Sequence, residues 1–213
     1  MIGGVNRLDN TRVLVTGGSG FIGTNLIDLL SYLGAEVSNV DIAPPFRDDH
    51  RPRWREGDIM NPDALGALVA EIDPHAIIHL AARVDTDSDE ADDYTMNHVG
   101  LANLVAASRS APSMNRFVFV STQFVLGPGV PHLDDLTFGP HTTYGASKER
   151  GERDLRADPP DATWVIARPT NIWGPWHLRY QRQFWRVVAK GLYLHPEGKD
   201  PIRSYGDVGS VCL

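Results

Sequence analysis

The stretch Thr16-Gly17-Gly18-Ser19-Gly20-Phe21-Ile22-Gly23 decides the fold, because it places a glycine-rich turn between two segments of different periodicity. Residues 12–16 before it are β-branched and apolar and predict a buried strand, while residues 24–33 after it predict a helix that stops at Gly34. Glycine in such a turn permits a tight bend, a close approach of the backbone to a pyrophosphate, and close packing of the helix on the strand. Backbone N–H groups at the start of the helix would then face the phosphate charge.

The same alternation continues along the chain. Further strands are predicted at 36–41, 76–80, 116–121 and 163–168, and further helices from Asn61-Pro62-Asp63 onward and at about 91–109, 144–156 and 178–190. Residues 43–57 predict a loop with a short strand near Trp54. Nearly continuous apolar strands are typical of a parallel sheet that helices cover on both faces. The sequence therefore predicts an α/β fold with a doubly wound parallel sheet of the Rossmann type.

Composition and charge exclude several classes of protein. The chain has 213 residues, of which 42% are hydrophobic, and a formal net charge of -7. This charge disfavours non-specific nucleic-acid binding, and no run approaches the roughly 18 apolar residues of a membrane span. The N-terminus shows no apolar signal segment, and the single cysteine, Cys212, allows neither a disulfide framework nor a cysteine metal site. We therefore expect a cytoplasmic protein without a metal; His75 and His79 lack the further ligands of a metal site.

Asp41 ends the second predicted strand, about 20 residues beyond the glycine loop, where a carboxylate can accept hydrogen bonds from an adenosine ribose. No arginine follows Asp41 directly, so a 2′-phosphate would meet a negative charge without a partner. This pattern favours NAD over NADP. The alternative is a solvated acid at a strand end.

Tyr144 and Lys148 open a predicted helix with the spacing i, i+4, which puts the phenol and the ammonium on one face. A nearby cation favours the phenolate, so Tyr144 could exchange a proton with a substrate hydroxyl while a hydride moves to or from nicotinamide. Ser121 and Thr122 follow a predicted strand and can offer a hydroxyl to the same oxygen. By itself, a tyrosine–lysine pair at this spacing is also common on exposed helices.

Together, and in this order, these segments resemble the extended short-chain dehydrogenase/reductase superfamily, and within it the NAD-dependent epimerase/dehydratase family that acts on nucleotide sugars. His79-Leu80-Ala81-Ala82, Ser121-Thr122-Gln123-Phe124-Val125-Leu126-Gly127 and Arg168-Pro169-Thr170-Asn171-Ile172-Trp173-Gly174-Pro175 add to the similarity. The resemblance implies cofactor contacts by Gly17, Gly20, Phe21, Ile22, Gly23, Asp41, Asp58, Ile59, Leu80, Ala81, Ala82, Asn97, Tyr144, Lys148 and Thr170.

The resemblance also implies roles in catalysis. Tyr144 would be the general acid/base, Lys148 would lower its pKa and hold the nicotinamide ribose, and Thr122, with Ser121 as a substitute, would bind the reacting oxygen. Asn171 and Arg203 would contact the substrate, and both favour a phosphate-bearing sugar. Family members commonly form homodimers, here through the helices near 91–109 and 144–156.

Two departures from the family pattern limit the expected function. Gln123 and Phe124 stand where dehydratases of the family carry acids, so sugar 4,6-dehydration is not expected. Family members also usually continue well beyond Arg203-Ser204-Tyr205. We therefore expect residues 1–213 to form one NAD-binding domain, in which 171–213 begin an incomplete, wetter substrate-binding region.

Three functions stay open at this point. The first is an NAD-dependent epimerase or oxidoreductase acting on a nucleotide sugar. The second is a truncated NAD-binding module without turnover, and the third is a reductase of non-sugar carbonyls.

Overall fold

The centre of the molecule is a parallel sheet of six strands. The computed structural model describes residues 6–178, 184–194, 198 and 204–213. Its main sheet has the order β3-β2-β1-β4-β5-β6, and every neighbouring pair is parallel. The strands are β1 (Arg12–Thr16), β2 (Glu36–Asp41), β3 (Trp54–Glu56), β4 (Ala76–His79), β5 (Arg116–Val120) and β6 (Thr163–Ala167). A separate parallel pair joins β7 (Asn171–Trp173) to β8 (Tyr205–Asp207).

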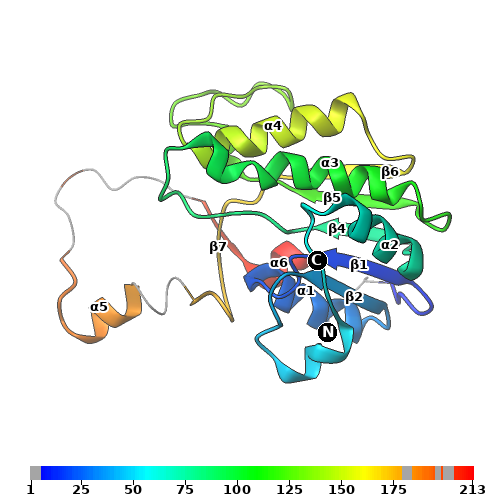
Figure 1. The fold of residues 1–213 in the computed structure, drawn as a ribbon. Helices are drawn as coiled ribbons and strands as arrows, with labels where there is room; N and C mark the ends of the chain where they lie inside the picture. The colour runs from blue at the N-terminus through cyan, green and yellow to red at the C-terminus, as the bar shows by residue number, and fades with distance from the viewer. Residues whose placement is uncertain (1–5, 179–183, 195–197, 199–203) are drawn as a thin grey trace.

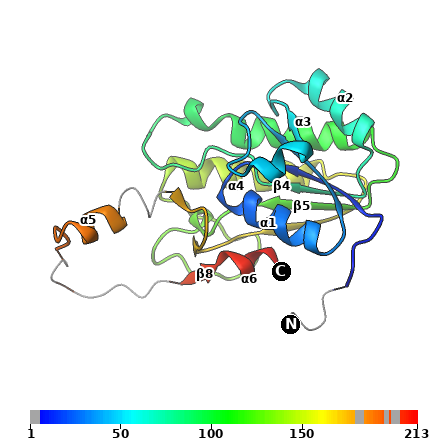
Figure 2. The same ribbon diagram turned by 90° about the horizontal axis from the view of Figure 1, so that it is seen from below.

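Helices cover both faces of the sheet, which confirms the predicted doubly wound architecture. The helices are α1 (Phe21–Tyr32), α2 (Pro62–Ile72), α3 (Met96–Ser108), α4 (Thr143–Ala157), α5 (Arg186–Ala189) and α6 (Val208–Cys212), with 3₁₀ turns η1 (Asp48–Arg53), η2 (Ala91–Tyr94) and η3 (Gln123–Val125). Figures 1 and 2 show α2, α3 and α4 on one face and α1 and α6 on the other. None of the helices in the described ranges is long and apolar enough to cross a membrane.

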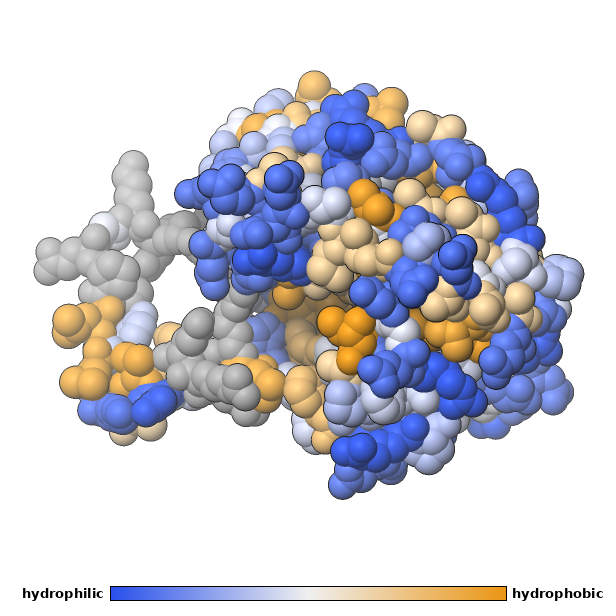
Figure 3. Space-filling view, in the orientation of Figure 1, coloured by the Kyte–Doolittle hydropathy of each residue, from blue (hydrophilic) through white to orange (hydrophobic). Residues whose placement is uncertain are grey.

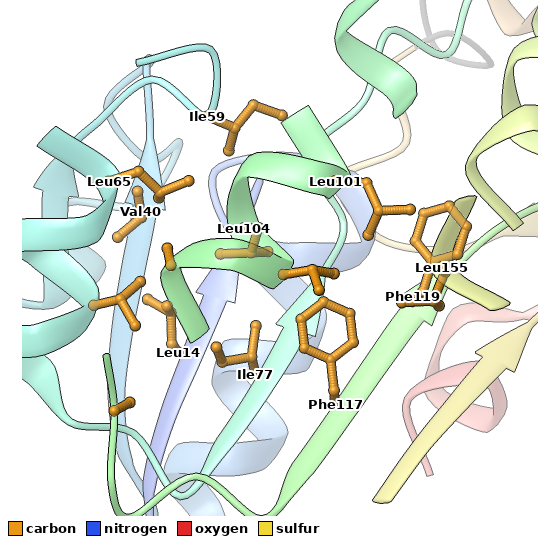
Figure 4. Packing of buried hydrophobic residues seen from close by; sticks show 14 residues of the cluster. Leu14, Val40, Ile59, Leu65, Ile77, Leu101, Leu104, Phe117, Phe119 and Leu155 are labelled. Atoms are coloured by element: carbon orange, nitrogen blue, oxygen red, sulfur yellow. The ribbon is translucent and has the colours of Figure 1, made fainter. Parts of the chain in front are cut away.

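The core is divided in two by the alternation of side chains along the strands. Val13 and Val15 of β1 point to α1 and pack with Leu26 and Ile27. Leu14, between them, points to the other face, into the larger cluster under α2, α3 and α4. Figure 4 shows this cluster, with side chains of β1, β4 and β5 facing those of α3. The two clusters fix the central strands, whose carboxyl ends all lie at the same end of the parallel sheet.

Local signals explain where most helices begin. Asn61 caps α2, as predicted: its Oδ1 accepts a hydrogen bond from Ala64 N at 3.2 Å. α1 begins at Phe21, three residues before the predicted start, because Gly20 has the extended conformation of an N-cap. The helix predicted at 91–109 is divided into η2 and α3.

The C-terminal part departs most from the expected pattern. α5 contains the end of the helix predicted at 178–190, while residues 179–183 lie outside the described part of the chain. The α5 segment extends from the body of the molecule (Figure 1), and its surface is largely hydrophobic (Figure 3). The β7–β8 pair and α6 were not predicted.

Candidate active site

A cleft of about 760 Å³ opens at the carboxyl ends of the central strands. It lies at β1, which has β2 on one side and β4 on the other. The connection after β1 leads to one side of the sheet and the connection to β4 leads to the other side. Ligands of open α/β sheets bind at such a point. Most residues that the sequence analysis selected line this cleft. They are Gly17, Gly20, Phe21, Ile22, Gly23, Asp41, Asp58, Ile59, Leu80, Ala81, Ala82, Ser121, Thr122, Tyr144, Lys148, Thr170 and Asn171.

The glycine loop forms a cradle of the kind that a phosphate group needs. Gly17 has φ +72°, and a Cβ there would lie 2.5 Å from Ala81 N in the turn after β4. A Cβ at Gly23 would lie 2.5 Å from Gly18 Cα, so side chains are excluded on both sides of the turn. Gly20 caps α1 without a side chain, which leaves the positive end of the helix facing the cleft. The loop therefore fits a pyrophosphate.

Asp41 connects the end of β2 to the glycine loop. Its Oδ2 accepts a hydrogen bond from Ser19 N at 3.1 Å, and its Oδ1 accepts one from Ala43 N at 3.0 Å. A carboxylate has about four acceptor positions, so two remain for ribose hydroxyls. Asp41 thus holds the glycine loop in place, in addition to the ribose contact that the sequence predicts. The spacing along the chain did not indicate this structural role.

The far end of the cleft is built by Asp58 and Ile59. Asp58 Oδ1 accepts a hydrogen bond from Met60 N at 2.8 Å, which fixes the turn before α2. Ile59 is buried and packs so closely on α3 that a Cβ at Gly100 would lie 2.4 Å from its Cδ1. These contacts make a firm apolar wall near Asp41.

Tyr144 and Lys148 lie in the first turns of α4, where Thr142 Oγ1 accepts a hydrogen bond from Gly145 N at 3.0 Å and caps the helix. The Lys148 side chain is buried; its Nζ donates to Val120 O at 2.8 Å and lies 4.6 Å from the centre of the Phe119 ring. Burial lowers the pKa of Lys148 to about 7, against the opposing influence of Glu152. The ammonium thus stands at the end of β5, on the cleft side of α4.

Two hydroxyl groups follow β5. Thr122 Oγ1 accepts a hydrogen bond from Phe124 N at 3.2 Å and caps η3. Ser121 Oγ is buried and has no hydrogen-bond partner among the described residues. Since a buried polar atom without a partner is costly, this hydroxyl at the wall of the cleft fits a ligand that would supply the missing hydrogen bond.

A neutral histidine lies beneath the site. His79 is fully buried, and its Nδ1 lies 2.6 Å from Thr16 Oγ1. Burial lowers the pKa of His79 to about 3, with a smaller contribution from the charge of Lys148. The described residues contain no group of three or more His, Cys, Asp or Glu side chains that could hold a metal ion.

Two selected residues stand apart from the cleft. Asn97 is fully buried and is absent from the lining of the cleft in the described chain: its Oδ1 accepts from Arg83 N at 2.8 Å, and its Nδ2 donates to Arg83 O and Ser147 Oγ, both at 2.9 Å. It therefore holds the segment after β4 against α3 and α4. Arg203 lies outside the described residues.

Sequence reasoning missed several lining residues, mostly apolar side chains in loops. They are Ile42, Phe46, Val84, Met96, His177 and Leu178. No periodicity marks loop residues, so no local signal could have found most of them. Phe124 also lines the cleft, and its ring centre lies 6.2 Å from that of Tyr144.

Comparisons with known proteins agree with this geometry. The sequence profile of the NAD dependent epimerase/dehydratase family matches residues 13–210. The chain is 32% identical over 200 residues to a 3-beta-hydroxysteroid dehydrogenase of Mycolicibacterium neoaurum, covering 87% of this chain and 54% of that protein. It is 30% identical over 193 residues to a UDP-glucose 4-epimerase of Vibrio cholerae, covering 85% of this chain and 58% of that protein.

Solved structures show the same similarity. The structure of a UDP-glucose 4-epimerase from Thermus thermophilus in complex with NAD superposes with a TM-score of 0.78 at 27% identity, covering 95% of this chain and 72% of that one. The chain spans a little over half the length of the two curated relatives named above, 54% and 58%.

Proposed function

Because this chain belongs to the NAD-dependent epimerase/dehydratase family, we propose that it binds NAD in the cleft and serves hydride transfer at a secondary alcohol or ketone carbon of a nucleotide sugar. One observation carries the proposal: the glycine cradle, Asp41 and the Tyr144–Lys148 pair line a single cleft. A dinucleotide needs Asp41 at its adenosine ribose, the glycine cradle at its pyrophosphate and the Tyr144–Lys148 pair at its reacting ring.

The chemistry divides between cofactor and protein. NAD, when bound, supplies the hydride acceptor or donor. Tyr144 Oη takes the proton of the substrate hydroxyl as the carbon is oxidised, and returns a proton when the carbonyl is reduced. The positive charge of Lys148 favours the phenolate form of Tyr144. Ser121 and Thr122 hold the reacting oxygen by hydrogen bonds, while Thr170 and Asn171 orient the two ligands.

The substrate is inferred from weaker support. The Vibrio cholerae relative is named for UDP-glucose, and Asn171 lines the cleft at the start of β7. We propose that residues 1–213 form one NAD-binding domain, in which 171–213 contribute the beginning of the substrate-binding part. A homodimer through α3 and α4 stays a prediction.

A second candidate substrate class is an apolar secondary alcohol or ketone. Phe124 offers an aromatic ring beside Tyr144, where a dehydratase of the family would carry an acid. The Mycolicibacterium neoaurum relative is named a hydroxysteroid dehydrogenase. A screen of substrates should therefore contain hydroxysteroids as well as nucleotide sugars.

The first test is calorimetric titration of the purified chain with NAD⁺ and NADP⁺. We expect saturable binding of NAD⁺, weaker binding of NADP⁺, and a loss of NAD⁺ affinity of at least about tenfold in Asp41→Ala, because the ribose hydroxyls lose a charged acceptor. A folded chain that binds neither dinucleotide would contradict the proposal.

The acid/base role has a separate test. Tyr144→Phe keeps the ring and removes only the hydroxyl, so we expect NAD⁺ binding to stay nearly unchanged and turnover to fall at least about a hundredfold. The measurement is NADH absorbance during the substrate screen. Turnover by Tyr144→Phe at the rate of the parent chain would exclude Tyr144 as the acid/base.

A further inference from the structure

A buried ion pair lies next to the proposed acid/base pair. Glu152, one helical turn after Lys148 on α4, is completely buried. Its two carboxylate oxygens receive both arms of one guanidinium: Arg168 Nε donates to Oε1 at 2.8 Å, and Arg168 Nη2 donates to Oε2 at 2.6 Å. This two-armed geometry is the strongest arrangement for an arginine and a carboxylate, and it fixes the direction of both groups.

The pair joins the two elements that meet at the reacting end of the cleft. α4 carries Tyr144 and Lys148, while Arg168 directly follows β6 and precedes Pro169 and Thr170. Lys148 Nζ, in turn, is held by Val120 O at the end of β5. The carboxyl ends of β5 and β6 and the start of α4 are therefore fixed to one another by polar contacts.

A second set of contacts fixes Arg168 itself. Its Nη2 also donates to Asp135 O at 2.8 Å, in the loop between η3 and α4. The Phe138 ring of this loop lies 5.0 Å from Arg168 Cζ and 4.6 Å from Arg153 Cζ. The guanidinium is thus held by α4 and by this loop together.

We propose that Glu152 and Arg168 are positioning residues for the reaction: their ion pair locks α4 to the end of β6 and sets the place and the charge of Lys148. The proposal rests on the proposed function, because Lys148 acts there beside Tyr144. Neither residue is among those that line the cleft in the described chain, so both act through Lys148.

The groups around Lys148 determine what each substitution does. Glu152 acts on it from α4, Val120 O and the Phe119 ring contact it from β5, and neutral His79 lies near it on β4. Tyr144 lies one helical turn before it on α4. Glu152 is the group that raises the pKa of Lys148 against burial. Arg168 lies behind Glu152 and neutralises part of its charge.

The two single substitutions should therefore shift the pKa of Lys148 in opposite directions. Glu152→Gln removes the carboxylate and leaves the guanidinium, so the pKa should fall. Arg168→Gln removes the two-armed partner of the carboxylate and leaves it only Arg156, whose Nη2 lies 4.0 Å from Oε2. More of the carboxylate charge then acts on Lys148, so the pKa should rise. We expect each shift to be about one pH unit.

The chain contains only three lysines, Lys148, Lys190 and Lys199, which makes the pKa directly measurable. Lysine labelled with ¹³C at Cε and ¹⁵N at Nζ should give three side-chain signals, and Lys148→Met identifies the one from Lys148. We would follow this signal from pH 5 to 11 in the parent chain, Glu152→Gln, Arg168→Gln, Arg168→Lys and the double variant Glu152→Gln/Arg168→Gln. NAD⁺ affinity would be measured in each variant by calorimetry.

The expected result is opposite shifts in the two single variants, an intermediate pKa in the double variant, and a near-parent pKa in Arg168→Lys. NAD⁺ affinity should fall about tenfold in Arg168→Gln and recover at least in part in Arg168→Lys. Shifts of the same sign, or none in folded variants, would overturn the proposal and leave the pair a merely structural contact.

Two further outcomes remain distinguishable. If a single variant does not fold, the double variant, which removes both charges of the Glu152–Arg168 pair together, still tests the charge effect. A pKa of Lys148 outside the range between the parent and the other single variant overturns the proposal. The titration needs neither cofactor nor turnover. Opposite shifts in a chain that binds no NAD⁺ would therefore contradict the proposed function and not the electrostatic role of the pair.

Discussion

Lys148 shows how one residue can be important for function and unfavourable for stability. Its ammonium is buried, with a hydrogen bond to Val120 O, and its pKa is lowered to about 7. Below pH 7 the group is charged in both the folded and the unfolded chain, so the full cost of burying the charge is present. As the pH rises from 7 to 10.5, the folded chain loses the proton first, and this cost disappears.

Lys148→Met should therefore stabilise the chain in a pH-dependent way. We expect a gain of about 2 kcal/mol in the free energy of unfolding at pH 6, which shrinks towards pH 10. Urea unfolding of the variant and the parent at both pH values measures it. The control is Lys190→Met at an exposed position, where no change is expected. A variant less stable than its parent at pH 6 would show that the ammonium stabilises the fold.

At the scale of the element, the β1–turn–α1 unit combines a backbone requirement with a binding role. Gly17 is the position where both meet, since it has positive φ and no room for a Cβ beside Ala81 N. Gly17→Ala should destabilise the chain by about 1–3 kcal/mol and weaken NAD⁺ binding at least about tenfold, because the turn must open. Thermal unfolding and calorimetry measure the two effects.

Gly66 is the matched control for this substitution. It lies inside α2, and a Cβ there would meet nothing within 4 Å. Gly66→Ala should therefore raise stability by about 0.5–1 kcal/mol and leave NAD⁺ affinity unchanged. Equal behaviour of the two variants would mean that the glycine turn is not under the constraint that its geometry indicates.

Elements with a strong local pattern could be predicted from the sequence, and elements without one could not. Five strands of the main sheet follow from β-branched and apolar residues, and α2 follows from its Asn61 cap. The sixth, β3, has the sequence Trp-Arg-Glu and was expected only as a short strand within a loop. β7 and β8 have three residues each and pair across more than thirty positions, with Asn171 opposite Tyr205. Such a pair has no periodicity of its own, because tertiary contacts alone create it.

The candidate site divides in the same way. Motif positions such as Asp41, Tyr144 and Lys148 were found because their chemistry requires a residue type at a fixed spacing. Their surroundings were not found: the Glu152–Arg168 pair and the burial of Ser121 Oγ depend on which helix packs against which strand end. Spacing along the chain therefore predicted which groups form the cleft, but not how these groups are charged or held.

For the whole molecule, α1 is the element that connects the cofactor cleft to the last residues of the chain. The ring centres of Phe21 and His177 lie 4.5 Å apart, and Asn25 Nδ2 donates to Pro175 O at 3.0 Å. α6 packs against the same helix, and its Cys212 contacts the core cluster under α1. Binding at the N-terminus of α1 should thus stabilise the docking of α6.

Cys212, the only cysteine of the chain, can report on this coupling. Burial raises the pKa of its thiol from 9.0 to about 11, with Asp207 contributing in the same direction. At pH 8 the folded chain should therefore react with a thiol reagent about a hundredfold more slowly than the chain in urea, because only the thiolate reacts. Saturating NAD⁺ should slow the reaction further, since it binds the folded form and reduces the opening of α6. Labelling at the denatured rate would mean that α6 is not docked on α1, and a rate indifferent to bound NAD⁺ would mean that α1 does not couple the cleft to the end of the chain.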